Sequence, residues 1–523
     1  MENKFESALK ATLNDKCILS ENGCNMFATS ASKLVDINFA VSSMRSMSAA
    51  QIQGKFQDAF YESPLLAVKW LFFARDIRGN GMGERRLFRI CFAWLANARP
   101  ELVKKLIPFV AEYGRFDDIL CSGLEGEVWD TVVDYIAEHL KNDLDNLADG
   151  KPVSLLAKWM PSVNTSSPKT KALAKKLRTA LGMDEKTYRK SLSALREKLR
   201  LVEVNASADN WSEIDYNAVP SMANLKYKNA FLKHDEARRR KYLADLEKPE
   251  SGAKINASAA FPCDIVHSYS AKLGFYDRKV SIDAALEAMW KALPDFVAGN
   301  NDGSTLVVCD GSGSMGCSIS SSSMRAIDVA HSLAIYFSEK LTGPFKDKYI
   351  TFSSCPKYVD LSNAKTLAEK ISIARHHSDM TNTDLKKTFM LILKTAVDNG
   401  LKQEDLPSNI LLVSDMQWDA GVSGYRSYGA SKCALMKEIA DEFAAHGYKL
   451  PRIVYWCVAG GYDRSNPIPV QMNAEGAVLV SGFSPALAKM VFSAKTNPYD
   501  VLVEALSSKR YQQIEDICKE AGI

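Results

Sequence analysis

The stretch TLVVCDGSGSM at residues 305–315 joins a short apolar run to an acidic, glycine-rich turn. Further apolar runs occur at residues 349–352, 410–413, 453–459 and 478–480. Helical patterns separate these runs, and in the first of them one face carries Ile327, Ala330, Ala334, Phe337 and Leu341. Short apolar runs that alternate with helices are typical of a parallel sheet buried on both faces. Residues 299–523 are therefore predicted to form a doubly wound α/β domain, with residues 349–352 as an edge strand.

The segment before residue 299 shows apolar residues at helical spacing and no alternating strand pattern, as in Leu87, Cys91 and Leu95. Typical helix-ending residues follow these patterns at Pro100, Gly114, Gly123 and Pro161. Residues 1–298 are therefore predicted to form an all-α array. A HEAT-like α-solenoid or a ring of helices would fit, although the segment has no clean self-similar period.

Composition places the chain among globular proteins. Its 523 residues are 46% hydrophobic and 24% charged, which argues against disorder and fibres. The first residues lack the basic and apolar regions of a secretory signal, and no apolar run is long enough to span a membrane. The 11 cysteines show no CxxC or CxxH spacing, so they are expected to be reduced thiols. We expect a cytoplasmic protein without a membrane partner.

Two acidic residues are predicted to meet at one edge of the sheet. Asp310, Ser312 and Ser314 directly follow one buried strand, and Asp415 follows another. Ligands bind at the carboxyl ends of strands in open α/β sheets. The hydroxyl-rich turn DMTNTD at residues 379–384 lies between these strands in sequence. Carboxylates and hydroxyls without His or Cys suit Mg²⁺ or Mn²⁺ and not zinc, although a helix-capping turn is the simpler alternative.

These motifs resemble the metal-ion-dependent adhesion site of von Willebrand factor A-type domains, which uses DxSxS, a later Thr and a later Asp. The resemblance covers residues 305–481. It implies Asp310, Ser312, Ser314, Thr381 and Asp415 as metal ligands. Met380 stands where the family usually has glycine, so Thr383 stays open as an alternative to Thr381. In such domains the metal binds an acidic group of a partner, which implies ligation and not turnover.

Three stretches of the first half resemble a family of uncharacterised cytosolic and phage proteins that is known only by a domain of unknown function. They are RDIRGNGMGERRLFR at residues 75–89, EYGRFDDIL at 112–120 and LLAKWMPSVNTSSPKTKALAKKLRTALGM at 155–183. The order of a helical array and an A-type domain is also similar to that of the Ro autoantigen. Its TROVE module is a ring of helical repeats that binds the ends of structured or misfolded non-coding RNA. This resemblance implies an RNA partner.

The charge distribution also favours RNA. The net charge is only +4, yet residues 169–200 hold eleven Lys and Arg against three Asp and Glu. The loop at residues 161–168 is rich in hydroxyls and opens a lysine-rich helix, as phosphate sites do. Aromatic residues and cations alternate between residues 216 and 242, a mixture suited to single-stranded nucleic acid. The candidate RNA-binding residues are Arg75, Arg78, Arg85, Arg86, Lys169, Lys171, Lys175, Lys176, Arg178, Arg189, Lys190, Arg238, Arg239 and Arg240.

Simpler explanations exist for these cations. The arginines of residues 75–89 could pair with Asp117 and Asp118, and the basic helices could be a solvated face whose aromatic residues belong to the core. The sequence predicts a non-catalytic, Ro-like ribonucleoprotein component with a Mg²⁺-dependent docking site. Its first alternative is a metal-dependent protein scaffold without RNA, and a more distant one is a nuclease that uses Asp310 and Asp415. No nucleophile with a base is recognisable in the sequence, so the protein is predicted not to be an enzyme.

Overall fold

The computed structural model describes residues 5–6, 9, 17–120, 123–271, 273–274, 277–300, 303–319, 323–419, 435–461 and 466–523. The chain forms two compact units, each assembled from separate segments. The sheet unit comprises Met1–Trp70 and Ala260–Lys509, and the helical unit comprises Leu71–Ala259 and Arg510–Ile523. These units differ from the predicted division into residues 1–298 and 299–523. Residues 1–70 and 260–298 belong to the sheet unit, and residues 510–523 belong to the helical unit.

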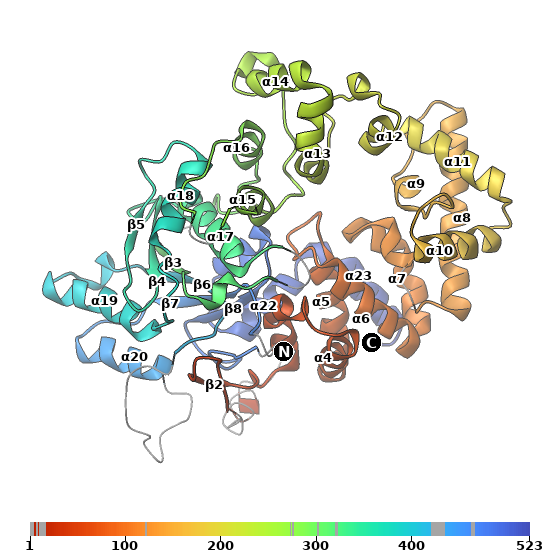
Figure 1. The fold of residues 1–523 in the computed structure, drawn as a ribbon. Helices are drawn as coiled ribbons and strands as arrows, with labels where there is room; N and C mark the ends of the chain where they lie inside the picture. Colours follow the sequence, from red (N-terminus) through yellow and green to blue (C-terminus); the bar gives the residue numbers. More distant parts are fainter. Residues whose placement is uncertain are drawn as a thin grey trace. The chain divides into compact units, whose positions relative to one another are not determined.

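The sheet unit contains a six-stranded sheet in the order β5-β4-β3-β6-β7-β8 (Figure 1). The strands are β3 (Thr305–Asp310), β4 (Lys348–Phe352), β5 (Tyr358–Asp360), β6 (Asn409–Ser414), β7 (Arg452–Cys457) and β8 (Ala477–Ser481). All neighbours pair in parallel except β4 and β5. Every predicted strand is confirmed, but the edge position was wrong. The antiparallel β5 covers β4, so residues 349–352 lie one strand inside the edge.

Helices cover this sheet as a doubly wound topology requires. α17 (Ala326–Lys340) packs on β3, β4 and β6, and α19 (Leu385–Asp398) packs on β4. The connection after β3 leads to β4 on one side of it, and a later connection leads to β6 on its other side. Because crossovers between parallel strands are right-handed, these two connections place their helices on opposite faces of the sheet. β3 is buried along its whole length, and Phe337 of α17 meets Trp456 of β7 with ring centroids 5.3 Å apart. The central strands therefore form the core of this unit.

Segments from the first 70 residues also belong to this core. They include the β1–β2 hairpin, β1 being Cys17–Leu19 and β2 Asn25–Phe27, and α2 (Lys33–Phe39), which packs against β8. The backbone N–H of Ser42 donates to Ser481 Oγ, and Ser42 Oγ donates to the Cys457 carbonyl, both at 2.9 Å. The expectation of helices alone before residue 299 was therefore wrong at this hairpin. Its strands are too short for alternation to be visible in the sequence.

The other helices of the sheet unit are α3 (Val41–Met44), α4 (Ala49–Glu62), α15 (Pro262–Ser270), α16 (Ala284–Lys291), α18 (Leu367–His377), α20 (Leu435–Ala445), α21 (Ala488–Val491) and α22 (Pro498–Leu506). α5 (Pro64–Arg75) continues from this unit into the helical unit. The nine described cysteines are all free thiols, as predicted, and six of them are buried. Among the described helices, none has both the length and the apolarity needed to cross a lipid bilayer.

The helical unit confirms the predicted succession of helices. It contains α6 (Arg85–Ala98), α7 (Pro100–Tyr113), α8 (Gly126–Ala148), α9 (Leu156–Trp159), α10 (Pro168–Ala180), α11 (Glu185–Lys198), α12 (Val202–Ser207), α13 (Ser221–His234), α14 (Glu236–Asp245) and α23 (Gln512–Glu520). α7 starts at Pro100 and is followed by Gly114, as the sequence predicts. α8 packs against α7, α9 and α11, while α23 packs on α7. A repeated solenoid or ring arrangement of these helices stays a prediction.

A buried carboxylate holds the first helices of this unit together. Asp118, which is fully buried, lies in a short 3-10 helix after α7. One of its oxygens accepts from Arg75 Nε and the other from Arg89 Nε, both at 2.8 Å. The backbone N–H of Arg115 adds a third hydrogen bond at 2.9 Å. This carboxylate thereby joins the end of α5 to α6, and the two guanidinium groups compensate its charge.

Asp118→Asn should destabilise the helical unit. Removal of one charge from a buried pair leaves the Arg75 guanidinium uncompensated, which costs about 3–5 kcal/mol. Urea unfolding of the full chain, followed by circular dichroism, would measure the loss. The exposed Asp130 of α8 provides the matched control, and Asp130→Asn should change stability by less than about 0.5 kcal/mol. Equal effects of the two variants would show that Asp118 has no such role.

Candidate functional site

The two predicted acidic ligands lie at the carboxyl ends of adjacent parallel strands. Asp310 is the last residue of β3, and Asp415 follows the last residue of β6. Both residues are buried, at 0% and 3% exposure. Asp310 accepts hydrogen bonds from Ser414 Oγ at 2.6 Å and from the Ser312 backbone N–H at 2.9 Å. The structure thus brings the two carboxylates to one edge of the sheet.

The two serines of the DxSxS motif complete this cluster. Ser312 Oγ lies 3.1 Å from Ser314 Oγ, and Ser314 in turn is hydrogen-bonded to the Asp415 carboxylate. Close packing restricts the turn that precedes these serines, since a Cβ on Gly311 would lie 3.3 Å from the Ser378 Cα. Four of the five predicted metal ligands are therefore neighbours. They offer two carboxylates and two hydroxyls.

The electrostatics of this cluster suit a cation. Burial raises the pKa of Asp310, and the charge of Asp415 raises it further. Burial also raises the pKa of Asp415, with an added contribution from the Glu21 carboxylate. A bound cation would stabilise the ionised forms that burial and mutual repulsion disfavour. Since the donors are all oxygen atoms, the residues fit Mg²⁺ or Mn²⁺.

The carboxylates alone do not make a metal centre. Within the described part of the chain, no group of three or more His, Cys, Asp or Glu side chains could hold a metal ion. A cation at Asp310 and Asp415 would therefore depend on the serine hydroxyls and on a further oxygen donor.

Thr381 and Thr383 occupy different places beside the cluster. The backbone N–H of Gly313 donates to the Thr381 carbonyl at 3.2 Å, so Thr381 lies directly on the DxSxS turn. Its exposed hydroxyl donates to Asp379 Oδ1 and accepts from Ser354 Oγ. Thr383 is buried, and its hydroxyl donates to the Gln417 carbonyl at 2.8 Å. Thr381 is thus the threonine whose backbone contacts the DxSxS turn, while its hydroxyl binds Asp379 and Ser354, and the choice between Thr381 and Thr383 as a ligand stays a prediction.

Two residues at this edge have left-handed backbone conformations. Met380 has φ of +55° and Met416, directly after Asp415, has φ of +62°. Residues other than glycine rarely adopt this conformation, and such strain clusters at functional sites. The N–H of Met380 donates to the Gly311 carbonyl at 3.0 Å, which ties this strained turn to the DxSxS motif.

Replacement of Met380 should reveal this strain. Met380→Gly should be neutral or stabilising by up to about 1 kcal/mol, because glycine adopts positive φ without steric cost. Met380→Val should destabilise by about 1–2 kcal/mol, since β-branched residues tolerate this conformation worst. Thermal unfolding of both variants would measure the difference. A valine variant at least as stable as the glycine variant would contradict the backbone assignment.

The β1–β2 hairpin supplies residues to this edge that the sequence analysis missed. The backbone N–H of Glu21 donates to Gln417 Oε1 at 2.9 Å. Asn22 Nδ2 donates to the Gln417 carbonyl at 2.6 Å and to Thr383 Oγ1 at 2.9 Å. Ser20 Oγ donates to the Trp418 carbonyl. The hairpin therefore supports the loop that carries Asp415, and no motif in residues 17–27 indicates this tertiary contact.

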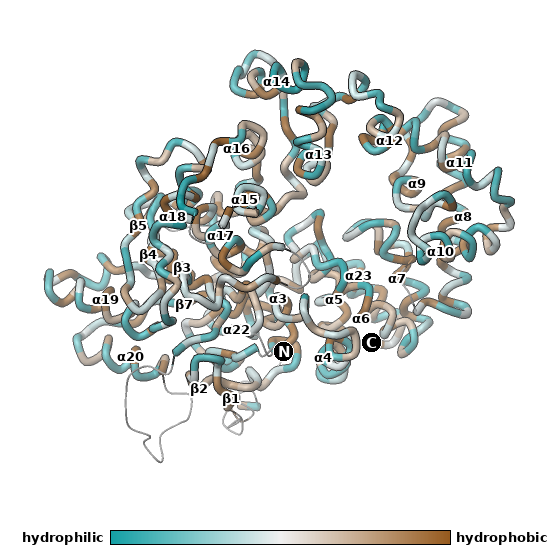
Figure 2. Tube along the Cα trace, viewed as in Figure 1, coloured by the Kyte–Doolittle hydropathy of each residue, from teal (hydrophilic) through white to brown (hydrophobic). Residues whose placement is uncertain are grey.

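The basic segment predicted at residues 169–200 forms two consecutive amphipathic helices, α10 and α11. Ser167 caps α10 by accepting from the Thr170 N–H, and Pro168 occupies its first turn. Both helices are mostly hydrophilic in Figure 2. Their buried apolar side chains include Leu177 in α10 and Leu192 and Leu195 in α11. The exposed predicted cations are Lys169, Lys171, Lys175, Lys176, Arg189 and Lys190. The two helices therefore carry a cationic surface, here called the α10–α11 surface.

Some cations of this region also have structural contacts. Lys176 Nζ lies 3.8 Å from the centre of the Trp129 ring, and Arg178 donates to the Met183 carbonyl at the end of α10. Arg196, which was not a predicted site residue, donates to the carbonyls of Ala157 and Met160 and to Ser162 Oγ, each at 2.8 Å. Arg196 therefore orders the start of the hydroxyl-rich loop at residues 161–168.

The arginines of residues 75–89 divide into two groups. Arg75 is buried and paired with Asp118, so its assignment to RNA was wrong. Arg89 pairs with both Asp117 and Asp118, as the simpler alternative predicted. Arg78, Arg85 and Arg86 are exposed, and their RNA contacts stay predictions.

The arginine run of α14 shows a similar division. Arg239 is fully buried, and its guanidinium carbon lies 4.9 to 5.2 Å from the ring centres of Tyr216, Phe231 and Tyr242. Its assignment to RNA was therefore wrong, and these aromatic rings form a core instead of stacking platforms. Arg238 pairs with Asp235 and donates to the carbonyls before α13, including Ile214. Arg240 is exposed and pairs with Glu236.

Comparisons with known proteins give two family matches. The family described as Domain of unknown function (DUF2828) matches residues 20–111 and 126–299. The family described as Domain of unknown function (DUF7788) matches residues 304–519. An uncharacterized protein of Acanthamoeba polyphaga mimivirus is 28% identical over 527 residues, covering 93% of this chain and 86% of the relative. Among solved structures, the crystal structure of the Deinococcus radiodurans Ro (RSR) protein has 14% identity and a TM-score of 0.37, covering 89% of this chain and 92% of that chain.

Proposed function

The chain belongs to the family of Domain of unknown function (DUF2828), and we propose that it is a cytoplasmic, Ro-like RNA-binding protein whose α10–α11 surface holds non-coding RNA. The observation that carries this proposal is the set of six exposed cations on two consecutive helices that follow a hydroxyl-rich loop. Lysine and arginine neutralise phosphates, and hydroxyls with helix N-terminal amides add hydrogen bonds. Structured or single-stranded RNA is the ligand with this chemistry, and the sequence resemblance to Ro proteins favours the same class.

We further propose that the sheet unit is a von Willebrand factor A-type domain with a Mg²⁺ or Mn²⁺ site. Asp310, Ser312, Ser314 and Asp415 would hold the cation, and Thr381 would contribute from the adjoining turn. The supporting observation is the burial of two carboxylates at the ends of β3 and β6. The cation would supply a Lewis-acidic position for an acidic group of a partner protein. The role proposed for these residues is docking and not nuclease turnover.

A metal-dependent scaffold without RNA is the alternative function. It would use the same cation site, while the α10–α11 surface would serve only solubility. RNA binding therefore separates the two functions, and the cation site does not.

RNA binding should depend steeply on salt and on the α10–α11 surface. A log–log plot of affinity against salt should have a slope of about −0.7 for each phosphate neutralised on single-stranded RNA. Charge reversal at Lys175, Arg189 and Lys190, all exposed, should weaken binding and flatten this slope. Fluorescence anisotropy with a labelled single-stranded RNA would measure both effects.

The matched control reverses the same number of charges on the sheet unit, at the exposed residues Lys394, Lys437 and Lys489. This control should bind RNA nearly as well as the wild type. An absent or salt-independent interaction in the wild type would favour the scaffold, and equal losses in both triple variants would indicate nonspecific charge effects.

Mg²⁺ or Mn²⁺ should raise the melting temperature of the full chain, because a ligand that binds only the folded state stabilises it, by about 2.7 kcal/mol at a hundredfold excess over Kd. Asp310→Asn should abolish this response. In EDTA, however, the variant should melt at a temperature at least as high as the wild type, because it removes the repulsion between two buried carboxylates.

The exposed Asp398 of α19 provides the control for this experiment. Asp398→Asn should retain the full response to Mg²⁺. A response of Asp310→Asn equal to that of the wild type would place the cation elsewhere, and stronger stabilisation by Zn²⁺ in both proteins would exclude the proposed oxygen site.

A further inference from the structure

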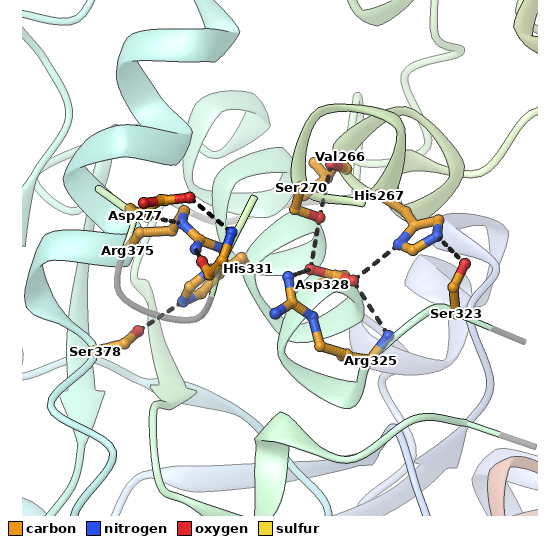
Figure 3. Close-up of polar contacts among 11 residues, drawn as sticks. Val266, His267, Ser270, Asp277, Ser323, Arg325, Asp328, His331, Arg375 and Ser378 are labelled. Carbon is orange, nitrogen blue, oxygen red and sulfur yellow. Dashed lines mark hydrogen bonds and ion pairs between the residues drawn. The ribbon is translucent and has the colours of Figure 1, made fainter. Parts of the chain in front are cut away.

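A serine, a histidine and an aspartate form a hydrogen-bonded chain within the sheet unit (Figure 3). Ser323 precedes α17, His267 lies on α15 and Asp328 lies in the first turn of α17. Ser323 Oγ is 2.9 Å from His267 Nε2, and His267 Nδ1 is 2.9 Å from Asp328 Oδ2. A nucleophile, a base and an acid that orients the base have this order in hydrolases with a Ser–His–Asp triad.

The surroundings of Asp328 keep its carboxylate ionised and fixed. Asp328 is buried, and it accepts from Ser270 Oγ at 2.7 Å and from the Arg325 backbone N–H at 3.1 Å. Burial alone would raise the pKa of Asp328, but the hydrogen bond from His267 and the charge of Arg325 outweigh this effect and lower the pKa to about 2. Asp328 is therefore an anion at neutral pH and can only accept hydrogen bonds.

The ionised carboxylate determines the tautomer of His267. Because Asp328 accepts at Nδ1, that nitrogen carries the proton, and the lone pair of the neutral imidazole is at Nε2. Ser323 then donates its hydroxyl proton to Nε2. Asp328 thus acts as a positioning residue that directs the basic nitrogen of His267 toward the serine oxygen.

The hydrogen-bonded series Ser323–His267–Asp328 differs from a second serine–histidine pair in Figure 3 because Ser323 is accessible. His331 Nε2 lies 2.8 Å from Ser378 Oγ, but both residues are buried, and burial lowers the pKa of His331 to about 4. Ser378 also donates to the Ala374 carbonyl. Ser323 is exposed, so a solute can reach its oxygen, whereas Ser378 lies in the interior.

We propose that Ser323 is an activated nucleophile that reacts with acyl esters and related electrophiles. Its Oγ forms a bond to the carbonyl carbon while His267 Nε2 takes the hydroxyl proton. The carbon–oxygen bond to the leaving alcohol breaks, and the imidazolium returns the proton to that oxygen. Water releases the acyl group in a second step with the same base. This reactivity requires neither the cation site nor RNA.

A fluorophosphonate probe tests the proposal on the full-length chain. The Ser323 oxygen displaces fluoride from phosphorus, and His267 accepts the proton. Mass spectrometry of peptides would then compare adducts at Ser323 with adducts at Ser318, an exposed serine of the same segment. We expect Ser323 to be labelled at least about 100-fold faster, the effect that a positioned general base supplies.

Three variants complete the experiment. Ser323→Ala should remove the adduct, Ser318→Ala should leave it unchanged, and His267→Gln should slow labelling by about 100-fold. A melting curve of His267→Gln shows whether the variant folds. The comparison of labelling at Ser323 and Ser318 in the wild type tests the proposal even if this variant does not fold. Equal labelling of the two serines, or undiminished labelling in a folded His267→Gln protein, would overturn the proposal.

Discussion

The pairing of β3 with β6 is the constraint on which the candidate metal centre depends. It places Asp310 and Asp415 at the same buried edge, where two negative charges repel each other and neither is well solvated. Hydrogen bonds from Ser414, Ser312 and the Gln417 backbone N–H offset part of this cost. The strained backbone at Met380 and Met416 and the hairpin contacts to residues 417–419 all surround this one edge. Much of the local structure therefore serves to hold two like charges together.

The sequence predicted the parts of this arrangement that depend on local pattern. Each buried strand is an apolar run of a few residues, and Asp310 and Asp415 follow their strands directly, so strand periodicity and motif spacing were sufficient. Contacts between distant segments gave no such signal. The β1–β2 hairpin is too short to show alternation, and His267 lies 61 residues before Asp328, so the hydrogen bond between them depends on how α15 packs against α17.

The cations show a different limit of sequence analysis. Arg75 and Arg239 belong to basic segments in the same way as Lys175 and Lys190, yet the first two are buried and the last two are exposed. A buried arginine requires a carboxylate or aromatic rings from other segments of the chain, as Asp118 provides for Arg75 and Tyr216 provides for Arg239. Charge counts along the chain therefore locate a basic segment but cannot separate its exposed members from its buried ones.

The discontinuity of the two units has a consequence for biosynthesis. A ribosome completes residues 71–259 long before it reaches Arg510, so the helical unit emerges without α23, the helix that packs on α7. The first 70 residues similarly emerge before the strands with which they share a core. Contacts between residues so far apart in the sequence form late, and they make folding slower. Until these contacts form, the incomplete units expose apolar surface. Nascent chains of this protein therefore have two unfinished cores at once, and the helical unit can complete its core only when residues 510–523 have been synthesised.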